Sequence, residues 1–227
     1  MDNDHMKSWM TLHSRRQIDL YDCREQDIDI SDISWALARI CRFNGHTSRF
    51  YSVACHCLGM ARYAIEMKLP TEVILKCLLH DAKEAYYGDI TKPVQKLLGI
   101  KWEWPWKQSV AKAIAKRFFN DREVVIDTRT VKELDDLFCL VEGYVLIGGH
   151  LWEAAYATAS VAPENWAKVE KIVKSFDYGQ DFSRVMCEYS KAIRYWHHVW
   201  LKENPTFKIE ELTDAEDTPK TANSAQG

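Results

Sequence analysis

The residues of this chain that could do chemistry fall into four short segments. His80 and Asp81 directly follow the apolar run Cys77–Leu79, a costly place for two polar side chains unless a ligand or a charge neutralises them. Glu84 comes four positions after His80 and three after Asp81, so all three share a face if the helix continues. Each of the other segments holds one candidate. His56 lies on the apolar stripe of an expected helix, Asp135 near the start of a later helix, and Asp89 in a loop.

Two imidazoles and two carboxylates from three helices would bind a divalent transition metal and leave coordination positions open for water. Such an ion lowers the pKa of bound water and can hold a phosphoryl oxygen at the same time. Glu84 or Asp89 could then carry the proton, since neither has to be a ligand.

Each feature also has an ordinary structural interpretation. A single inward histidine is more often a hydrogen-bonded core residue than a ligand, and Asp135 beside Asp136 could be a solvated helix start. Spacing alone does not choose between those two carboxylates. In Cys55-His56-Cys57, consecutive helical side chains point about 100° apart, so at most one of the three, His56, is a ligand. The set is distinguished by its order, His, His-Asp, Asp, with helix-sized gaps of 24 and 54 residues.

Composition favours a helical globular protein as the scaffold. Of 227 residues, 47% are hydrophobic and 28% charged, the balance of one ordinary domain. Nine glycines and six prolines are too few for the many turns of an all-β fold. No apolar run could span a membrane, the acidic N-terminus does not resemble a secretory signal, and a net charge of −3 gives no general attraction for nucleic acid. We therefore expect a cytoplasmic protein whose seven cysteines are mostly reduced and buried.

Helical periodicity predicts an all-α fold, a single bundle of about seven helices. Residues 1–31 are expected to be a lead-in, 32–204 the domain, and 205–227 a disordered tail. The first helix is expected from near Ser34 to a stop at Asn44-Gly45. The other six helices are expected at 52–68, from 71 towards 81, and at 105–119, 130–147, 163–176 and 182–201, with a loop at 87–93.

The motifs resemble those of the HD-domain metal-dependent phosphohydrolases, in particular the branch that contains 5′-deoxynucleotidases and phage dATP triphosphohydrolases. The segment Leu79-His80-Asp81-Ala82-Lys83-Glu84-Ala85, with Gly88-Asp89-Ile90 and Pro93-Val94 after it, is similar to the second motif of that branch. Three further segments resemble its Arg-aromatic element, its first-histidine motif and its third motif: Ala38–Gly45, Ser52–Cys57 and Val131–Asp135. The likeness covers roughly residues 32–150.

The resemblance implies a catalytic metal ion with four ligands: His56, His80, Asp81 and Asp135. It thereby selects Asp135 over Asp136. It also implies that Glu84 exchanges a proton with the attacking water or the leaving oxygen, assisted by Asp89. Histidine and carboxylate ligands suit Co²⁺, Mn²⁺, Zn²⁺ or Fe²⁺, and Mg²⁺ could accompany a phosphate tail.

The resemblance further implies a substrate site. Arg42 would contact the phosphate, and Phe43 would stack near the sugar or base, where many relatives carry Trp. An aromatic ring against the sugar would favour deoxy substrates. Lys92 and Lys96 are candidates for a longer phosphate tail, with ordinary surface lysines as the equal alternative.

These expectations describe a hydrolase acting at the 5′ phosphate of a deoxynucleotide. The leading hypothesis is a dNTP triphosphohydrolase of the dATP type, and the alternative is a 5′-deoxynucleotidase acting on dNMPs. A di-iron oxygenase would need further site histidines, and the spare ones match no such motif: His46, His150, His197 and His198. A non-catalytic binding module would not need Glu84 and Asp89 beside four ligands. We expect no nucleic-acid or membrane partner, a location in the cytoplasm (that of the host if the protein is viral), and a homo-oligomer whose interface could include Trp102, Trp104 and Trp106.

Overall fold

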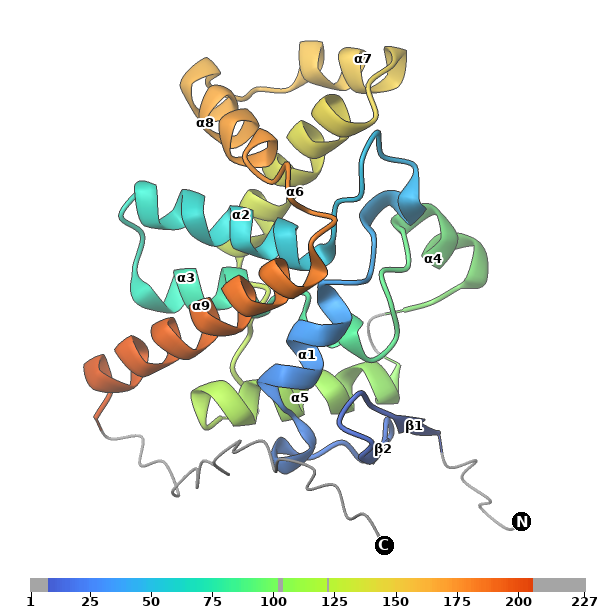
Figure 1. Cartoon of the computed structure of the whole chain (residues 1–227), viewed down its shortest axis with the longest axis vertical. Coiled ribbons are helices and arrows are strands. Elements are labelled where there is room, and N and C mark those ends of the chain that lie inside the picture. The colour runs from blue at the N-terminus through green and yellow to red at the C-terminus, as the bar shows by residue number, and fades with distance from the viewer. Residues whose placement is uncertain (1–7, 102–103, 122, 206–227) are drawn as a thin grey trace, which may run out of the picture.

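Nine α-helices make up the fold in the part of the chain that the structure, a computed structural model, describes: residues 8–101, 104–121 and 123–205. The fold is all-α apart from one short hairpin, as the sequence predicts (Figure 1). In chain order the helices are α1 (Ile30–Leu37), α2 (Val53–Glu66), α3 (Thr71–Leu79), α4 (Lys92–Leu98), α5 (Pro105–Phe119), α6 (Arg129–Leu146), α7 (His150–Thr158), α8 (Pro163–Lys174) and α9 (Phe182–Glu203).

Helix α2 is the centre of the bundle. It packs against α3, α6, α8 and α9 (Figure 1), and eleven of its 14 residues are buried. Gly59 allows a close approach to α6, because a Cβ there would lie 2.8 Å from Cε1 of Phe138. His56 therefore lies in the interior, where a polar side chain needs a partner.

Hydrogen bonds from side chains fix where the site-bearing helices begin. Ser52 accepts a hydrogen bond from the backbone N–H of Cys55 at the start of α2, and Thr128 accepts one from Val131 at the start of α6. Such caps satisfy backbone donors that a helix start leaves unpaired. They fix the registers in which α2 and α6 present His56 and Asp135.

The lead-in packs on the same core as the helices. Strands β1 (Trp9–Thr11) and β2 (Gln17–Asp19) pair antiparallel, and a 3₁₀ turn η1 (Glu25–Asp27) follows. Leu12 and Ile18 are buried in the core that the helices share. Residues 1–7 and 206–227, which include nearly all of the predicted tail, lie outside the described part.

Seven of the nine helices match predicted ones, and two do not. Helix α4 starts inside the predicted loop 87–93, because Pro93 stands in its first turn, where proline is favourable. Helix α7 was not expected at all. Neither helix has a buried residue, so neither shows the apolar periodicity on which the prediction depends.

The predicted end of the first helix was also wrong. Helix α1 stops at Leu37, and the 3₁₀ turn η2 (Arg42–Gly45) follows as a separate element. Phe43 and Asn44 there have φ angles of 54° and 51°, in the left-handed region that breaks a helix. The Asn-Gly pair marks this turn rather than the end of α1.

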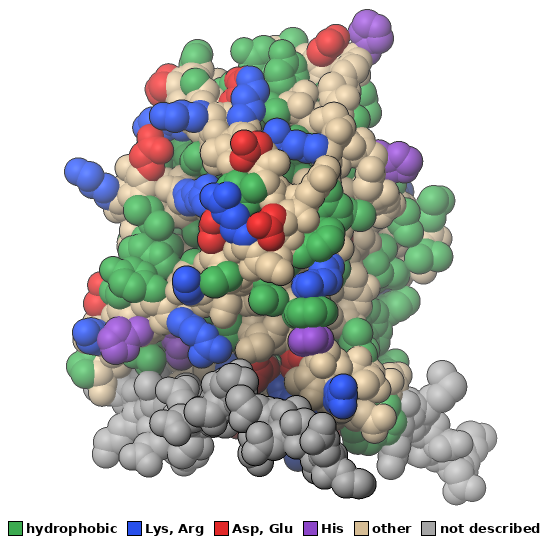
Figure 2. All heavy atoms as spheres, in the orientation of Figure 1, with side chains coloured by type: hydrophobic (Ala, Val, Ile, Leu, Met, Phe, Trp, Pro, Cys, Tyr) green, Lys and Arg blue, Asp and Glu red, His purple; other side chains and the backbone are tan. Residues whose placement is uncertain are grey.

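The surface in view carries charges of both signs in mixture, with hydrophobic side chains near α4 on the right (Figure 2). Leu97 and Leu98 of α4 are 86% and 62% exposed. No helix among the described residues combines the length and apolar character needed to cross a bilayer. All seven cysteines are free thiols, and four of them are buried.

Candidate metal centre and substrate pocket

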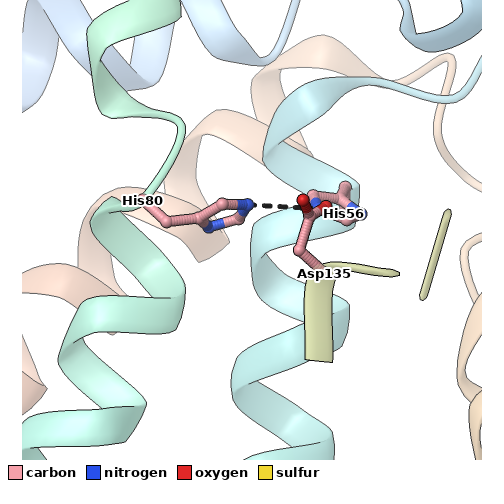
Figure 3. Close-up of side chains that lie close together, drawn as sticks. All are labelled: His56, His80 and Asp135. Atoms are coloured by element: carbon pink, nitrogen blue, oxygen red, sulfur yellow. Dashed lines mark hydrogen bonds and ion pairs between the residues drawn. The ribbon is translucent and has the colours of Figure 1, made fainter. Parts of the chain in front are cut away.

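Three helices bring His56, His80 and Asp135 together (Figure 3). His56 projects from the first turn of α2, His80 from the C-terminal end of α3, and Asp135 from the second turn of α6. Nε2 of His56 lies 3.2 Å from Nε2 of His80 and 3.2 Å from Oδ1 of Asp135. Two histidines 24 residues apart and an aspartate further along the chain thus point donor atoms at one spot.

Asp81 supplies the fourth donor. Its Oδ2 lies 3.0 Å from Nε2 of His80 and 3.8 Å from Nε2 of His56. Helix α3 ends at Leu79, and the chain turns into the 3₁₀ segment η3 (Ala82–Ala85), so the carboxylate can lie beside the imidazole of its neighbour. Lys83 fixes this turn by donating to the His80 carbonyl and pairing with Asp127 at 3.2 Å.

Each imidazole has its other nitrogen occupied by a buried acceptor. Nδ1 of His56 lies 2.7 Å from Oε1 of Glu142, which is 0% exposed, and Nδ1 of His80 lies 2.9 Å from the carbonyl oxygen of Cys77. Both contacts favour the tautomer with the proton on Nδ1, which leaves the Nε2 lone pair free. Metal-binding histidines characteristically have such an acceptor behind them.

The donor set fits a divalent transition metal. Ligands about 2.1 Å from a common ion lie roughly 3 Å apart when they meet at right angles, and the three shortest donor separations are 3.0, 3.2 and 3.2 Å. Two neutral imidazoles whose lone pairs face each other would repel without a cation between them. The nitrogen and carboxylate donors match Co²⁺, Mn²⁺, Zn²⁺ or Fe²⁺.

The pKa shifts show that the site favours positive charge. Burial lowers the pKa of His80, but the charges and hydrogen bonds of Asp81 and Cys57 together outweigh it and hold this pKa well above its ordinary value. Burial and Arg42 lower the pKa of His56, and Glu142 and Asp135 raise it by more. Burial raises the pKa of Asp135, yet the hydrogen bond and charge of His56 keep it far below the usual range. The same carboxylates would stabilise the positive charge of a divalent ion.

One further ligand-type residue, Cys57, lies at the other edge of the His80 ring. Sγ of Cys57 is 3.9 Å from Nδ1 of His80, and Cys57, His80 and Asp81 could in principle hold an ion. That nitrogen already donates to the Cys77 carbonyl, and burial raises the pKa of the Cys57 thiol, so thiolate is disfavoured. Of Cys55-His56-Cys57, His56 therefore offers the better-placed donor atom.

Glu142 is the functional residue that the sequence analysis missed. It is fully buried on α6, contacts His56 through Oε1, and forms an ion pair from Oε2 to Nε of Arg42 at 3.0 Å. Glu142 stands seven residues, about two helical turns, after Asp135, and that spacing was the available signal. One carboxylate therefore positions both a candidate metal ligand and the arginine predicted to contact phosphate.

Arg42 is buried between acidic groups. Its Nη1 lies 3.6 Å from Oδ2 of Asp81, in addition to the contact with Glu142. Burial lowers its pKa, but Glu142 and Asp81 raise it by more, so the guanidinium remains charged. The lysines that also line the pocket include Lys83, which is already paired with carboxylates, and Lys107, which is buried.

Glu84 and Asp89 both lie at the pocket, half-buried. Oε2 of Glu84 is buried and has no hydrogen-bond partner among the described residues. Burial, followed by the charges of Asp81 and Asp89, raises the pKa of Glu84 well above its ordinary value. Burial likewise raises the pKa of Asp89. A carboxyl group that is readily protonated, with a free oxygen, suits proton exchange.

A cavity of about 700 Å³ opens beside the donor cluster. Seven of the ten residues singled out from the sequence line it: Arg42, Phe43, Asp81, Glu84, Asp89, Lys92 and Asp135. The pocket also contacts Tyr87, Leu151 and Trp152, which the sequence analysis did not assign to it.

Other predicted residues lie elsewhere. Lys96 is exposed on α4 and does not line the cavity, so the structure does not support it as a phosphate contact. Its neighbour Lys92 does line the cavity, and pairs with Asp136 at 3.3 Å. Trp104 and Trp106 contact each other, and Trp106 packs on Tyr87, behind the pocket lining. Trp102 lies outside the described residues. Of the spare histidines, His46 alone lines this cavity.

Comparison with known proteins gives partial relatives without an assigned function. No family model matches the sequence. The uncharacterized protein YfdR of Escherichia coli K12 is 45% identical over 74 residues, which is 33% of this chain and 39% of that protein. An uncharacterized protein of Rhodobacter capsulatus is 36% identical over 97 residues, which is 41% of this chain and 50% of that protein. The similarity thus spans at most half the length of these curated relatives.

Proposed function

We propose that this chain is a metal-dependent phosphohydrolase of the HD-domain type that cleaves deoxynucleotides at the 5′ phosphate. The observation that carries the proposal is the convergence of two imidazoles and two carboxylates, with a buried acceptor behind each imidazole, beside a pocket that contains an arginine. The partial relatives neither add to this proposal nor conflict with it.

His56, His80, Asp81 and Asp135 would hold the metal ion. When bound there, the ion would polarise a phosphoryl oxygen and acidify a water molecule. Glu142 and the Cys77 carbonyl orient the two imidazoles through their Nδ1 atoms, so both Nε2 atoms face the site before any ion arrives. Asp81, close to Nη1 of Arg42, joins the ion-binding and phosphate-binding groups.

Arg42 binds the phosphate in this mechanism. Its guanidinium is fixed by Glu142 and charged at all working pH values, so it offers donors to anionic oxygens at no cost of rearrangement. The carboxylates around it repel an unaccompanied phosphate, which makes binding depend on the cation as well. Phosphate affinity and metal loading are therefore expected to rise and fall together.

Glu84 exchanges the proton. Attack of water on the α-phosphorus breaks the bond between phosphorus and O5′, the water loses a proton, and the leaving oxygen gains one. The free Oε2 of Glu84 can carry this proton, because its raised pKa makes both the charged and the protonated form accessible. Asp89 modulates Glu84 through its charge.

The preferred substrate is a dNTP of the dATP type, with deoxynucleoside and triphosphate as products. Lys92 lines the pocket and supports a phosphate tail, with Mg²⁺ as its companion ion. The alternative is a 5′-deoxynucleotidase acting on dNMPs, and the position of Lys96 outside the pocket favours it, because a long tail then meets fewer cations.

A product assay tests the proposal. Purified protein with Mn²⁺ or Co²⁺ is given each dNTP, each dNMP and the matching ribonucleotides, and the products are separated by anion exchange. His80→Ala and Glu84→Ala proteins are assayed alongside, with Lys96→Ala as a control for a changed surface charge. We expect triphosphate from dATP, lost in the first two variants and retained in the third.

Turnover of dNMPs alone would move the protein to the 5′-deoxynucleotidases. The absence of metal-dependent hydrolysis with every nucleotide would refute the proposed reaction. Equal activity of the His80→Ala protein would refute the assigned metal centre.

A further inference from the structure

Helix α7 forms one side of the pocket although it contributes no buried residue to the core. It follows Gly148 and Gly149, whose φ angles of 71° and 86° turn the chain away from α6. Leu151 is 79% exposed, and Trp152 is half-buried. Of the residues of α7, Leu151 and Trp152 line the pocket, and Trp152 is the aromatic one.

Trp152 lies in a slot on α6 that only a glycine leaves open. A Cβ at Gly143 would be 2.4 Å from both Cε3 and Cζ3 of the indole ring, too close for any real contact. Gly143 is buried inside α6, where glycine is less favourable than alanine. The glycine therefore weakens its own helix and at the same time admits the tryptophan ring.

Phe43 meets Trp152 on the pocket wall. The two ring centroids are 5.8 Å apart and the ring planes are nearly perpendicular, at 88°. Phe43 reaches this place from a left-handed backbone conformation, which is unfavourable for a phenylalanine. The loop that carries it is tied to the end of α6 by a hydrogen bond of 2.7 Å from the Ser48 N–H to the Leu146 carbonyl.

We propose that Trp152 is a specificity-determining residue that recognises a planar heterocyclic ring in the substrate. Together with Phe43 it forms an aromatic corner, in which a flat ring can stack on one side chain and meet the edge of the other. The corner lies in the same cavity as Arg42 and Asp135, so a phosphate ester with its phosphate at the metal side can extend its ring towards α7. This inference rests on the proposed function for the phosphate end of the substrate.

Equilibrium binding separates ring recognition from phosphate recognition. Dissociation constants for dAMP and for 2-deoxyribose 5-phosphate are measured by calorimetry with Mn²⁺ in the Glu84→Ala background, which removes turnover. The two ligands share sugar and phosphate and differ in the base. Loss of a stacking contact weakens binding by about five- to 150-fold. We expect Trp152→Ala to cause that loss for dAMP only, and Trp152→Phe to restore most of it.

Gly143→Ala provides a second route to the same result. It favours the α6 helix yet displaces the indole ring, so the protein is expected to fold and to lose dAMP affinity as Trp152→Ala does. Tyr195→Ala serves as a control, because that side chain is 61% exposed on α9 and does not line the pocket.

Three results would overturn the inference: dAMP affinity unchanged in both the Trp152→Ala and Gly143→Ala proteins, equal losses for both ligands, or no preference for dAMP over the sugar phosphate before substitution. Failure of the proposed reaction is read separately. Absence of hydrolysis with intact ring preference would remove the reaction and leave the aromatic corner standing. Hydrolysis with unchanged binding in both variants would remove the corner alone.

Discussion

The two sides of the pocket are built in opposite ways. The metal side comes from α2, α3 and α6, where His56, His80 and Glu142 are almost completely buried and every donor has a charged or polar neighbour. The rim comes from α4 and α7, which contribute no buried residue and expose leucines to solvent. A rigid, charge-coupled wall suits chemistry, and a lightly held apolar wall suits selection among substrates.

The largest effect is expected from the pair of neighbouring aspartates on α6. Asp135 points at Nε2 of His56, whereas Asp136 points outward to Lys92. Substitution of a ligand should exceed the 10- to 100-fold loss typical of residues behind ligands. We therefore expect Asp135→Asn to weaken Mn²⁺ or Co²⁺ binding by more than about 100-fold and Asp136→Asn to leave it within about threefold. Metal titration calorimetry measures both, and equal affinities would contradict the assignment.

Removal of the metal should destabilise the metal side and leave the rim as it was. An ion present at 100 times its Kd raises the free energy of unfolding by about 2.7 kcal/mol. For a domain of this size, that corresponds to a fall in Tm of about 5–10 °C on chelation. Hydrogen exchange should accelerate in α2 and α6 and stay constant in α7. The Tm of an Asp135→Asn protein should not change on chelation. Equal acceleration of hydrogen exchange in α2, α6 and α7 would contradict the proposed difference between the metal side and the rim.

Glu142 tests whether the buried wall acts as a unit. Glu142→Gln keeps the shape but removes the charge that faces His56 and Arg42. We expect metal affinity to fall by about 10- to 100-fold and KM for the nucleotide to rise, since Arg42 loses its support. Glu133→Gln on the same helix is the matched control, because Glu133 is exposed and pairs only with Arg129 in the described structure. A loss of stability with unchanged metal affinity would reduce Glu142 to a purely structural role.

The contrast also separates what the sequence could predict from what it could not. The helices of the metal side have buried apolar stripes, so their periodicity predicted them. The resemblance to the HD-domain phosphohydrolases indicated which of their side chains would be candidate ligands. Helices α4 and α7 lack buried residues, and no pattern distinguished them from loops. Glu142 was missed because a glutamate in a helix is normally a solvent-facing residue, and only its burial shows its partners.

Aromatic recognition at the rim could not be predicted for a related reason. Trp152 follows Gly148-Gly149 in what reads as a flexible connection, and its partner Gly143 reads as an ordinary weak point in a helix. Their relation is visible only in the structure, where a Cβ at Gly143 would lie 2.4 Å from the indole ring of Trp152. Long-range contacts of this kind leave no trace in local periodicity.

The smallest effect concerns a half-buried histidine without carboxylate partners. His197 on α9 packs edge-on against Phe118, at 5.3 Å between centroids, and burial, with help from the charge of Arg117, lowers its pKa to about 4. The histidines of the metal side show the opposite shift because acids surround them. Since the folded pKa of His197 lies below the unfolded value of about 6.5, the unfolded chain takes up the proton first. Its contribution to stability is therefore complete above pH 6.5 and is lost as the pH falls towards 4.

One pKa unit corresponds to about 1.4 kcal/mol, and a ring with some solvent contact realises part of its shift, so we expect roughly 1–2 kcal/mol from His197 between about pH 7.5 and pH 4.5. In urea denaturation, the free energy of unfolding of the His197→Gln protein should fall less on acidification than that of the unsubstituted protein, by this amount. His198→Gln, at an exposed position, should follow the unsubstituted protein. If all three proteins lost the same free energy of unfolding on acidification, burial would not lower the pKa of His197. His197 could then no longer serve as the comparison for the raised pKa values of His56 and His80.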